Sequence, residues 1–216
     1  MFSKSALIVL LSLTFCFVGC ATKPDVRIDP SWMDAPQSVS VEISEPLVEI
    51  LDDVKDDLPD AAGHFGEWLS VELQKEMAAR TKADVQVSLK EDSYFKTSRD
   101  TLNNKTISYP SANFSNTRDV TLLINPIKVH RYEESMKMYN GMGVNSATGG
   151  TYTSTQFYLA FDLVYAYYDT KTKKLLGFGS VMAKDDFMVA MTKSNWIATV
   201  KDAVNLLLKG TPLLKK

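Results

Sequence analysis

The sequence predicts an α+β domain in which a mainly antiparallel sheet of about five strands is packed by two long helices, in the order β-α-β-β-β-β-α. Five stretches are predicted to be strands: apolar residues recur at every second position in 39–43, 84–89 and 120–124, apolar or aromatic residues fill both faces of 157–169, and 175–183 returns as its partner. Apolar residues recur at helical spacing in two longer stretches, 60–80 and 195–209. The length of 216 residues and a hydrophobic fraction of 45 % suit a single domain with a proper core.

The first strand is followed by a proline that suits the first turn of a short helix, Pro46. Apolar residues between Leu47 and Leu58 would share one face of this helix. Acidic residues fill the other face: Glu49, Asp52, Asp53, Asp56 and Asp57. Such a face is either solvated or an acidic docking or cation site, and we favour the solvated face because the D-x-D-x-D-G spacing of a calcium loop is absent.

The most strand-like stretch of the chain runs from Phe157 to Asp169, with apolar or aromatic residues on both faces. A strand covered on both faces belongs near the centre of a sheet. After a turn, residues 175–183 return as its partner strand. The second long helix, Asn195 to Lys209, can be capped by Thr192 or Ser194.

Two inserts interrupt this pattern. Residues 90–118 are rich in Ser, Thr and Asn, and we expect a long loop or an extra hairpin there. Residues 131–156 contain methionines and glycines without a clear period, and we expect an irregular segment. Between the inserts, the apolar phase slips by one residue after Asn125-Pro126, which predicts a β-bulge or an edge position.

The amino terminus has the pattern of an export signal. Lys4 precedes an apolar run from Ala6 to Val18, which is too short to span a bilayer comfortably, and Gly19-Cys20 follows. This pattern resembles the lipobox of bacterial lipoproteins. The resemblance implies a signal peptide over residues 1–19, cleavage before Cys20, a thioether-linked diacylglycerol on Cys20 and an acylated amino terminus carrying a chain such as palmitate. A plain secretory peptide or a signal anchor with an incidental cysteine is the alternative.

The residue after the lipidated cysteine implies where the protein resides. Ala21 stands where an Asp would resemble an inner-membrane retention signal. The resemblance therefore implies the outer membrane, with the body facing the periplasm; the inner membrane and the cell surface stay open. Residues 20–37 are expected to form a lipidated tether reaching up to roughly 55 Å when extended, and residues 38–216 the periplasmic domain. In the tether, Trp32 and Met33 either pack on the domain or dip into the membrane interface, and we favour packing.

The body itself resembles a group of periplasmic lipoprotein domains. The resemblance rests on the order of the predicted elements and on the hairpin from Asp162-Leu163-Val164-Tyr165 to Lys174-Leu175-Leu176-Gly177. The group includes the curli-secretion lipoprotein, the lipoprotein activators of peptidoglycan synthases and the amino-terminal domain of the Tol-Pal translocation protein. Lys173 stands where these families often have Gly. The resemblance implies a fold over residues 38 to 210 and assigns no functional residue.

The sequence offers no catalytic or cofactor-binding constellation and no metal site. His64, with Asp60 and Glu67 nearby, lacks a second histidine, and His130 is expected to be exposed at a strand end. Phosphate-binding loops and dinucleotide fingerprints are absent, and a net charge of −2 gives no footprint for nucleic acid.

We therefore expect a protein that is not an enzyme: a membrane-anchored, non-catalytic envelope module that binds or assembles with another envelope protein. Cys20 is its one assignable site. The alternative is a subunit of an oligomeric outer-membrane secretion or transport apparatus, in which residues 90–118 and 131–156 act as hairpins between subunits.

Overall fold

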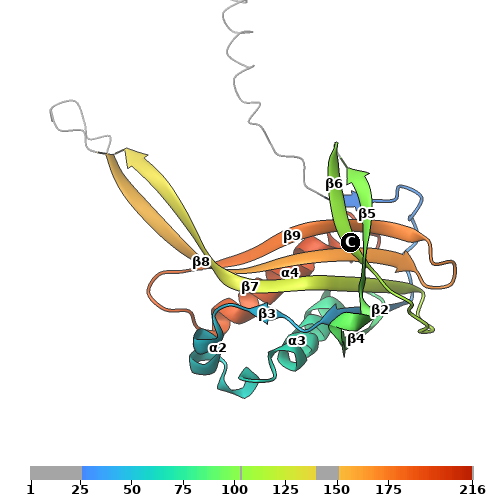
Figure 1. Ribbon diagram of the computed structural model, residues 1–216, viewed down its shortest axis with the longest axis horizontal. Helices are drawn as coiled ribbons and strands as arrows, with labels where there is room; N and C mark the ends of the chain where they lie inside the picture. The colour runs from blue at the N-terminus through green and yellow to red at the C-terminus, as the bar shows by residue number, and fades with distance from the viewer. Residues whose placement is uncertain (1–25, 103, 140–150, 216) are drawn as a thin grey trace, which may run out of the picture.

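The computed structural model describes residues 26–102, 104–139 and 151–215, and its centre is a mixed seven-stranded sheet (Figure 1). The strands lie in the order β1-β9-β8-β7-β2-β4, with β3 beside β7. Strand β2 is parallel to both β4 and β7, whereas β7, β8, β9 and β1 pair antiparallel. The bounds of the sheet strands are β1 Val26–Ile28, β2 Ser38–Ser44, β3 Leu47–Val48, β4 Asp84–Lys90, β7 Val120–Tyr139, β8 Thr151–Asp169 and β9 Leu175–Phe187.

The two faces of the sheet are covered differently. Helices pack on one face: α2 Leu51–Asp57, the one-turn η2 Pro59–Ala61, α3 Phe65–Arg80 and α4 Lys193–Leu208. A separate two-stranded hairpin packs on the other face: β5 Lys96–Leu102 and β6 Lys105–Ser111, entered through the one-turn η3 Asp92–Tyr94. The mixed α/β class is thus confirmed, while the sheet has more strands than the predicted five and includes parallel pairs. Strands β2 and β4 are parallel because the chain crosses over between them through α3.

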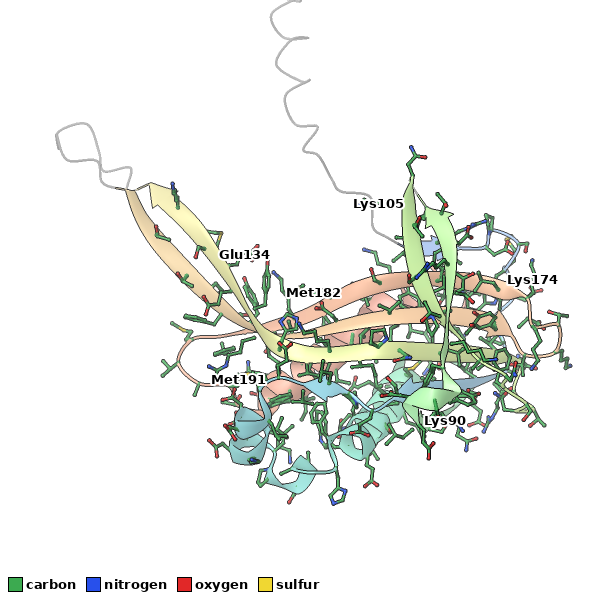
Figure 2. All side chains as sticks on the ribbon, viewed as in Figure 1. Lys90, Lys105, Glu134, Lys174, Met182 and Met191 are labelled. Atoms are coloured by element: carbon green, nitrogen blue, oxygen red, sulfur yellow. The ribbon has the colours of Figure 1, made fainter. Side chains whose placement is uncertain are left out.

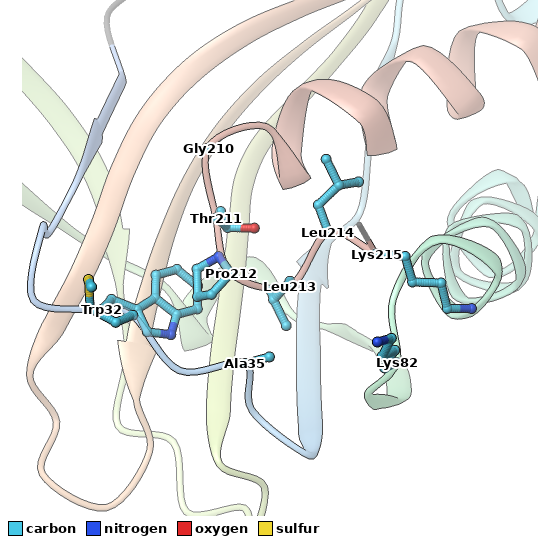
Figure 3. Close-up of a pocket in the computed structure, with 10 residues that line it drawn as sticks. Trp32, Ala35, Lys82, Gly210, Thr211, Pro212, Leu213, Leu214 and Lys215 are labelled. Carbon is cyan, nitrogen blue, oxygen red and sulfur yellow. The ribbon is translucent and has the colours of Figure 1, made fainter.

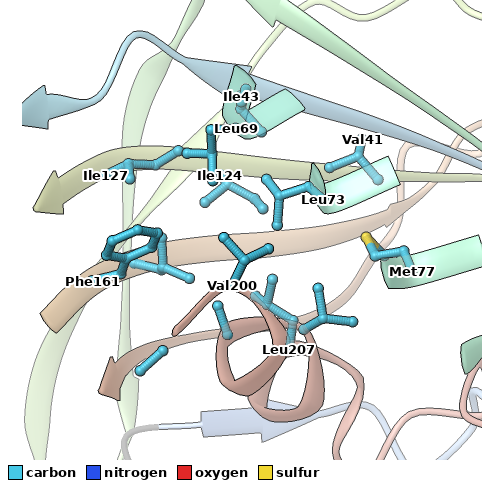
Figure 4. Packing of buried hydrophobic residues seen from close by; sticks show 14 of the residues in the cluster. Val41, Ile43, Leu69, Leu73, Met77, Ile124, Ile127, Phe161, Val200 and Leu207 are labelled. Carbon is cyan, nitrogen blue, oxygen red and sulfur yellow. The ribbon is translucent and has the colours of Figure 1, made fainter. Parts of the chain in front are cut away.

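The helix-facing core is the larger of the two buried clusters (Figure 4). Leu69, Leu73 and Met77 of α3 meet Val200 and Leu207 of α4 over the sheet, and all five side chains are buried. Burial of each such side chain stabilises the fold by about 1.5–3 kcal/mol. Thr192 caps α4 as predicted, since its backbone N–H donates to Asn195 Oδ1 at 2.9 Å.

The smaller core lies under the β5–β6 hairpin. The rings of Tyr109 and Phe178 stack with centroids 4.5 Å apart, and Phe114 contacts Tyr168 at 5.4 Å. The Tyr168 hydroxyl donates to the carbonyl of Pro110 at 3.0 Å. The extra hairpin foreseen as one possibility for residues 90–118 is therefore present, and its aromatic side chains fix it to the sheet.

Strand β8 lies between β7 and β9, which confirms the central position predicted for residues 157–169. The register between β7 and β8 shifts between Ile124 and Ile127, where the bulge was predicted. Lys173, in the turn after β8, has the left-handed φ of 61° that usually favours Gly. Its side chain compensates by lying 3.9 Å from the centroid of the Phe114 ring.

Three predicted elements need correction. The helix predicted from Pro46 begins at Leu51, because Leu47–Val48 instead pair with β7 as strand β3. Helix α3 begins at Phe65 rather than Asp60, since Gly63 adopts a positive φ of 81° that breaks the helical path. The insert at 131–156 is not irregular: its described residues continue β7 and begin β8.

The expected tether is also shorter than its sequence suggested. Residues 26–28 add strand β1 to the edge of β9, and the Asp29 N–H donates to the Leu176 carbonyl at 2.7 Å. Lys174 pairs with Asp29 at 2.7 Å and, with hydrogen bonds from Ser31, holds the pKa of this carboxyl well below its usual range. The Trp32 ring packs 5.2 Å from that of Tyr167, so packing is the correct interpretation for this residue. For Met33 the packing interpretation is wrong, because its side chain is 78 % exposed. Residues 26–37 therefore belong to the folded body.

Candidate functional site

The residues singled out from the sequence do not converge on a catalytic or metal centre. Cys20 and the rest of the lipobox lie outside the described residues. His64 stands at the start of α3, 3.8 Å from Glu67 Oε2, with most of its side chain exposed. Within residues 26–102, 104–139 and 151–215, no three His, Cys, Asp or Glu side chains come together as metal ligands. In the same ranges, no helix has the length and apolar character needed to cross a membrane.

His130 is the second histidine, and its expected exposure is wrong. Its side chain is only 14 % exposed, and Nε2 lies 2.9 Å from Asp162 Oδ2 on the neighbouring strand. Nδ1 lies 2.9 Å from the carbonyl oxygen of Arg131. His130 pairs with Ala160 on β8, and Asp162 is two residues further along the same strand. The side chain of His130 therefore lies against β8 instead of extending into solvent. The His130–Asp162 pair ties β7 to β8 just past the end of β3, where the sheet narrows to β7, β8 and β9.

Beyond Glu133 and Phe157, β7 and β8 run on together as a two-stranded arm that projects from one end of the body (Figure 1). Strand β9 stops at Phe187, opposite Phe157, and β3 pairs with β7 only as far as Val129. The ladder of β7 and β8 continues from Glu134↔Gln156 to Tyr139↔Thr151. We call the described residues 134–139 and 151–156 the arm. At about 3.4 Å per residue, the arm reaches roughly 20 Å past the sheet.

We call residues 131–133 of β7 and 157–158 of β8 the root of the arm. Its helix-facing side is braced by a charge pair and aromatic rings. Both oxygens of the Asp53 carboxylate accept hydrogen bonds from Arg131 Nη2 at 2.7 Å. The Arg131 guanidinium also lies 5.9 Å from the centroid of the Phe187 ring, which is 6.1 Å from that of Phe157. Asp53, from the acidic face of α2, thus helps to hold the root of the arm. Asp52 and Asp56 of the same face are exposed, as predicted.

The opposite side of the root carries two tyrosines around one lysine. Lys184 Nζ lies 4.1 Å from the ring centroid of Tyr158 and 5.1 Å from that of Tyr132, and it pairs with Glu134 Oε2 at 3.1 Å. Loss of hydration raises the pKa of the Tyr158 hydroxyl, and the positive charge of Lys184 opposes that rise. Figure 2 shows Glu134 on the arm and Met182 on the neighbouring open part of the sheet. Both Met182 and Met136 of the arm are more than one-third exposed.

Sequence reasoning missed the arm, although one signal pointed to it. Thr151, Thr153 and Thr155 occupy every second position, and β-branched residues at that period favour a strand. The alternate positions are polar as well, so the contrast between the two faces is weak. An alternation of apolar with polar residues marks a strand with one buried face, and the arm has none.

Comparisons with known proteins identify no family for the chain. No family model matches, and no curated protein matches by sequence. Three solved structures resemble the fold distantly. A homolog of the neuraminyllactose-binding hemagglutinin from Helicobacter pylori has 11 % identity and a TM-score of 0.38, with 82 % of this chain and 84 % of that chain covered.

The second is a PelC dodecamer from Paraburkholderia phytofirmans, with 10 % identity, a TM-score of 0.38 and coverage of 88 % of this chain and 95 % of that one. The third is a minor lipoprotein from Acinetobacter baumannii, with 11 % identity, a TM-score of 0.31 and coverage of 79 % and 88 %. At TM-scores below 0.5, these likenesses assign neither a site nor an activity.

Proposed function

We propose that the protein is a lipid-anchored, non-catalytic envelope module that binds or assembles with another envelope protein through its arm. The proposed anchor is lipid on Cys20, and the proposed location is the outer membrane with the body facing the periplasm. The observation that carries the proposal is the arm, a two-stranded ribbon with an unpaired outer edge on each strand in its described part.

The free edges favour a binding role because each presents backbone N–H and C=O groups without a strand partner. A two-stranded ribbon alone is marginally stable in water, whereas a third strand would pair its backbone groups and cover its side chains. An extended segment of a partner protein can supply that strand, with hydrogen bonds along the backbone giving affinity. Charged residues such as Glu133 and Lys137 discourage indiscriminate pairing of the same edge.

The shortened tether sets how close an anchored body would lie to the bilayer. With β1 bound to the sheet, the chain between Cys20 and Val26 spans at most about 21 Å, compared with roughly 55 Å for the full tether. The body would stay close to the bilayer, where envelope partners are concentrated.

An oligomeric subunit of a secretion or transport apparatus is the second candidate. The same free edges favour it, because the arm of one copy can pair with a second copy. Light scattering of the detergent-purified protein separates the two: a discrete oligomer that dissociates when the arm is removed favours the second candidate, and a monomer favours the first.

Photo-cross-linking in cells tests the arm as the contact. A photoreactive amino acid at Met136, on the arm, should capture a specific envelope protein. The same group at Val71, an exposed position on helix α3 of the body, is the matched control and should capture none. Equal capture from both positions, or from neither, would contradict the proposal.

An armless variant adds a second test. Replacing residues 134–156 by Asn-Gly would join Glu133 to Phe157 across a two-residue turn and leave the body intact. We expect unchanged thermal unfolding of the body and loss of the captured partner in a pull-down. A pull-down that retains the partner would place the contact elsewhere.

A further inference from the structure

We infer that the end of the body opposite the arm is a face that contacts anionic phospholipids. Its centre is a groove of about 660 Å³ between the segment before β2 and the segment after α4. Figure 3 shows Trp32 on one side of the groove, Lys82 and Lys215 on the other, and Pro212 and Leu213 between them. This inference rests on the proposed lipid anchor at Cys20.

The groove exposes apolar side chains that the fold does not use. Met33 is 78 % exposed and Leu214 is 41 % exposed, although each lies beside a residue that packs inward. Trp32 is partly buried against Tyr167 and lines the groove with the rest of its ring. An exposed methionine and leucine beside a tryptophan suit the boundary between lipid headgroups and acyl chains, where amphipathic rings collect.

The charges at the groove suit a negative surface. Lys82 and Lys215 line it, and Lys209 directly precedes Gly210 of its wall, whereas no carboxylate is among the residues that line it. In the described part of the chain, neither Lys82 nor Lys209 has a hydrogen-bond or ion-pair partner. Lys215 donates to the carbonyl of Ala79 at 3.0 Å, so a carboxylate does not neutralise it there. Unpaired lysines are attracted by phosphate headgroups over about one Debye length.

The position of the proposed anchor favours phospholipid, rather than a protein, as the occupant of the groove. Cys20 is six residues before Val26, and β1 leads directly into the segment that carries Trp32 and Met33. A lipid on Cys20 would confine the groove to within a few nanometres of the bilayer at all times. Such confinement raises the effective concentration of headgroups, so a small face suffices for docking.

Docking through this face would also orient the molecule. The arm leaves the body at the opposite end from the turns around the groove (Figure 1). A body that rests on the bilayer through the groove would therefore point its arm away from the membrane, toward partners in the aqueous compartment.

Fluorescence of the complete lipidated protein tests this inference. Met33→Cys introduces the one reactive thiol, since Cys16 leaves with the signal peptide and Cys20 carries lipid in the proposed form. An environment-sensitive dye on this thiol is measured in vesicles of phosphatidylcholine with 30 % phosphatidylglycerol, and again in detergent. Met188→Cys is the matched control, because Met188 is 88 % exposed in the loop beside the root of the arm.

We expect iodide quenching of the dye at position 33 to fall at least threefold in the anionic vesicles, with no change at position 188. Each of the added substitutions Lys82→Gln and Lys209→Gln should lower the equilibrium ratio of docked to undocked protein about fivefold on the anionic vesicles. On vesicles of phosphatidylcholine alone, the same substitutions should change this ratio little.

Flotation of the same samples tests the proposed lipid anchor separately from the proposed phospholipid-contacting face. Protein that fails to float with vesicles would refute the anchor. Protein that floats but leaves the dye at position 33 fully open to iodide would refute the face while leaving the anchor standing, and a protein occupant of the groove would then replace lipid.

Discussion

The packing of β1 against β9 sets how far the body could move from the proposed anchor, and Gly177 is the residue on which this packing depends. A Cβ atom at position 177 would lie 2.8 Å from the carbonyl oxygen of Arg27 and 2.8 Å from Cδ1 of Ile28. Carbon atoms do not approach backbone oxygen so closely, so Gly177→Ala must displace β1 or shift β9. Because β9 is held by β8 and α4, we expect β1 to move.

The magnitude follows from the cost of this overlap. Inserting one methyl group into a packed contact costs about 1–3 kcal/mol. If the whole cost falls on the bound state of β1, the population with β1 detached rises about 5- to 150-fold. The free part of the chain then grows from about 21 Å toward the roughly 55 Å of an unbound tether.

Limited proteolysis measures this population. Trypsin cleaves after Arg27 only when the chain around it leaves the sheet, and the rate follows the detached fraction when detachment is fast. We expect cleavage after Arg27 to accelerate at least fivefold in Gly177→Ala, with little change in urea unfolding of the whole domain. Ser180→Ala, at an exposed position beyond the β1 pairing, is the control and should cleave like the natural sequence.

Unchanged cleavage after Arg27 in a stably folded Gly177→Ala protein would refute the packing of β1. Faster cleavage that is fully explained by lower global stability would also contradict the local argument.

Three further predictions concern single side chains. Tyr167→Phe should lower the free energy of unfolding in urea by about 1–3 kcal/mol, because the Tyr167 hydroxyl donates to the buried carbonyl of Leu207 at 3.0 Å. Tyr165→Phe should be neutral or stabilising, because the buried Tyr165 hydroxyl has no partner among the described residues, and equal costs for the two substitutions would contradict this contrast. Burial raises the pKa of Tyr165 to about 12, so the unfolded state loses this proton at a lower pH than the folded state does. The contribution of Tyr165 to the free energy of unfolding is therefore fully present below pH 10, and it should fall by about 2–3 kcal/mol as the pH rises to 12. Tyr165→Phe should remove that part of the alkaline slope, and an unchanged slope would refute it. Arg131→Gln should change global stability by less than about 1 kcal/mol, since its pair with Asp53 is partly exposed, while amide exchange in the arm accelerates severalfold; exchange that stays unchanged would show that the pair does not brace the arm.

Elements with a periodic stripe of buried apolar residues were predictable from sequence. The stripe of Leu69, Leu73 and Met77 in α3, and the alternation of Val39, Val41 and Ile43 in β2, each reflect contact with the same core. The central position of β8 followed from apolar residues on both of its faces. In each case, burial of apolar side chains is both the signal in the sequence and the force that stabilises the element.

Elements held mainly by backbone pairing were not predictable in this way. Val26–Ile28 is too short for a period, and it is a strand because the edge of β9 was free beside it. Leu47–Val48 pair with β7 for the same reason and displace the predicted helix start. In the arm, none of the side chains described at residues 134–137 and 153–156 is buried. These contacts depend on residues distant in sequence, which a local pattern does not contain.

Within the candidate site, the sequence predicted the anchor but not the proposed binding surfaces. Cys20 could be proposed as the lipidation site because the residues that resemble a lipobox are contiguous in the sequence. The bracing of the arm by Arg131 and Asp53 joins residues 78 positions apart, and the groove joins Trp32 to Leu214. Neither juxtaposition follows from spacing along the chain.

The most direct test of the account is the mass of the amino-terminal peptide of the mature protein, extracted from membranes and digested. We predict a peptide that begins at Cys20 and carries a diacylglycerol thioether and an acylated amino group, absent from a Cys20→Ser variant. A mature chain that begins elsewhere, or that retains a free thiol at Cys20, would contradict the anchored module and the phospholipid face together.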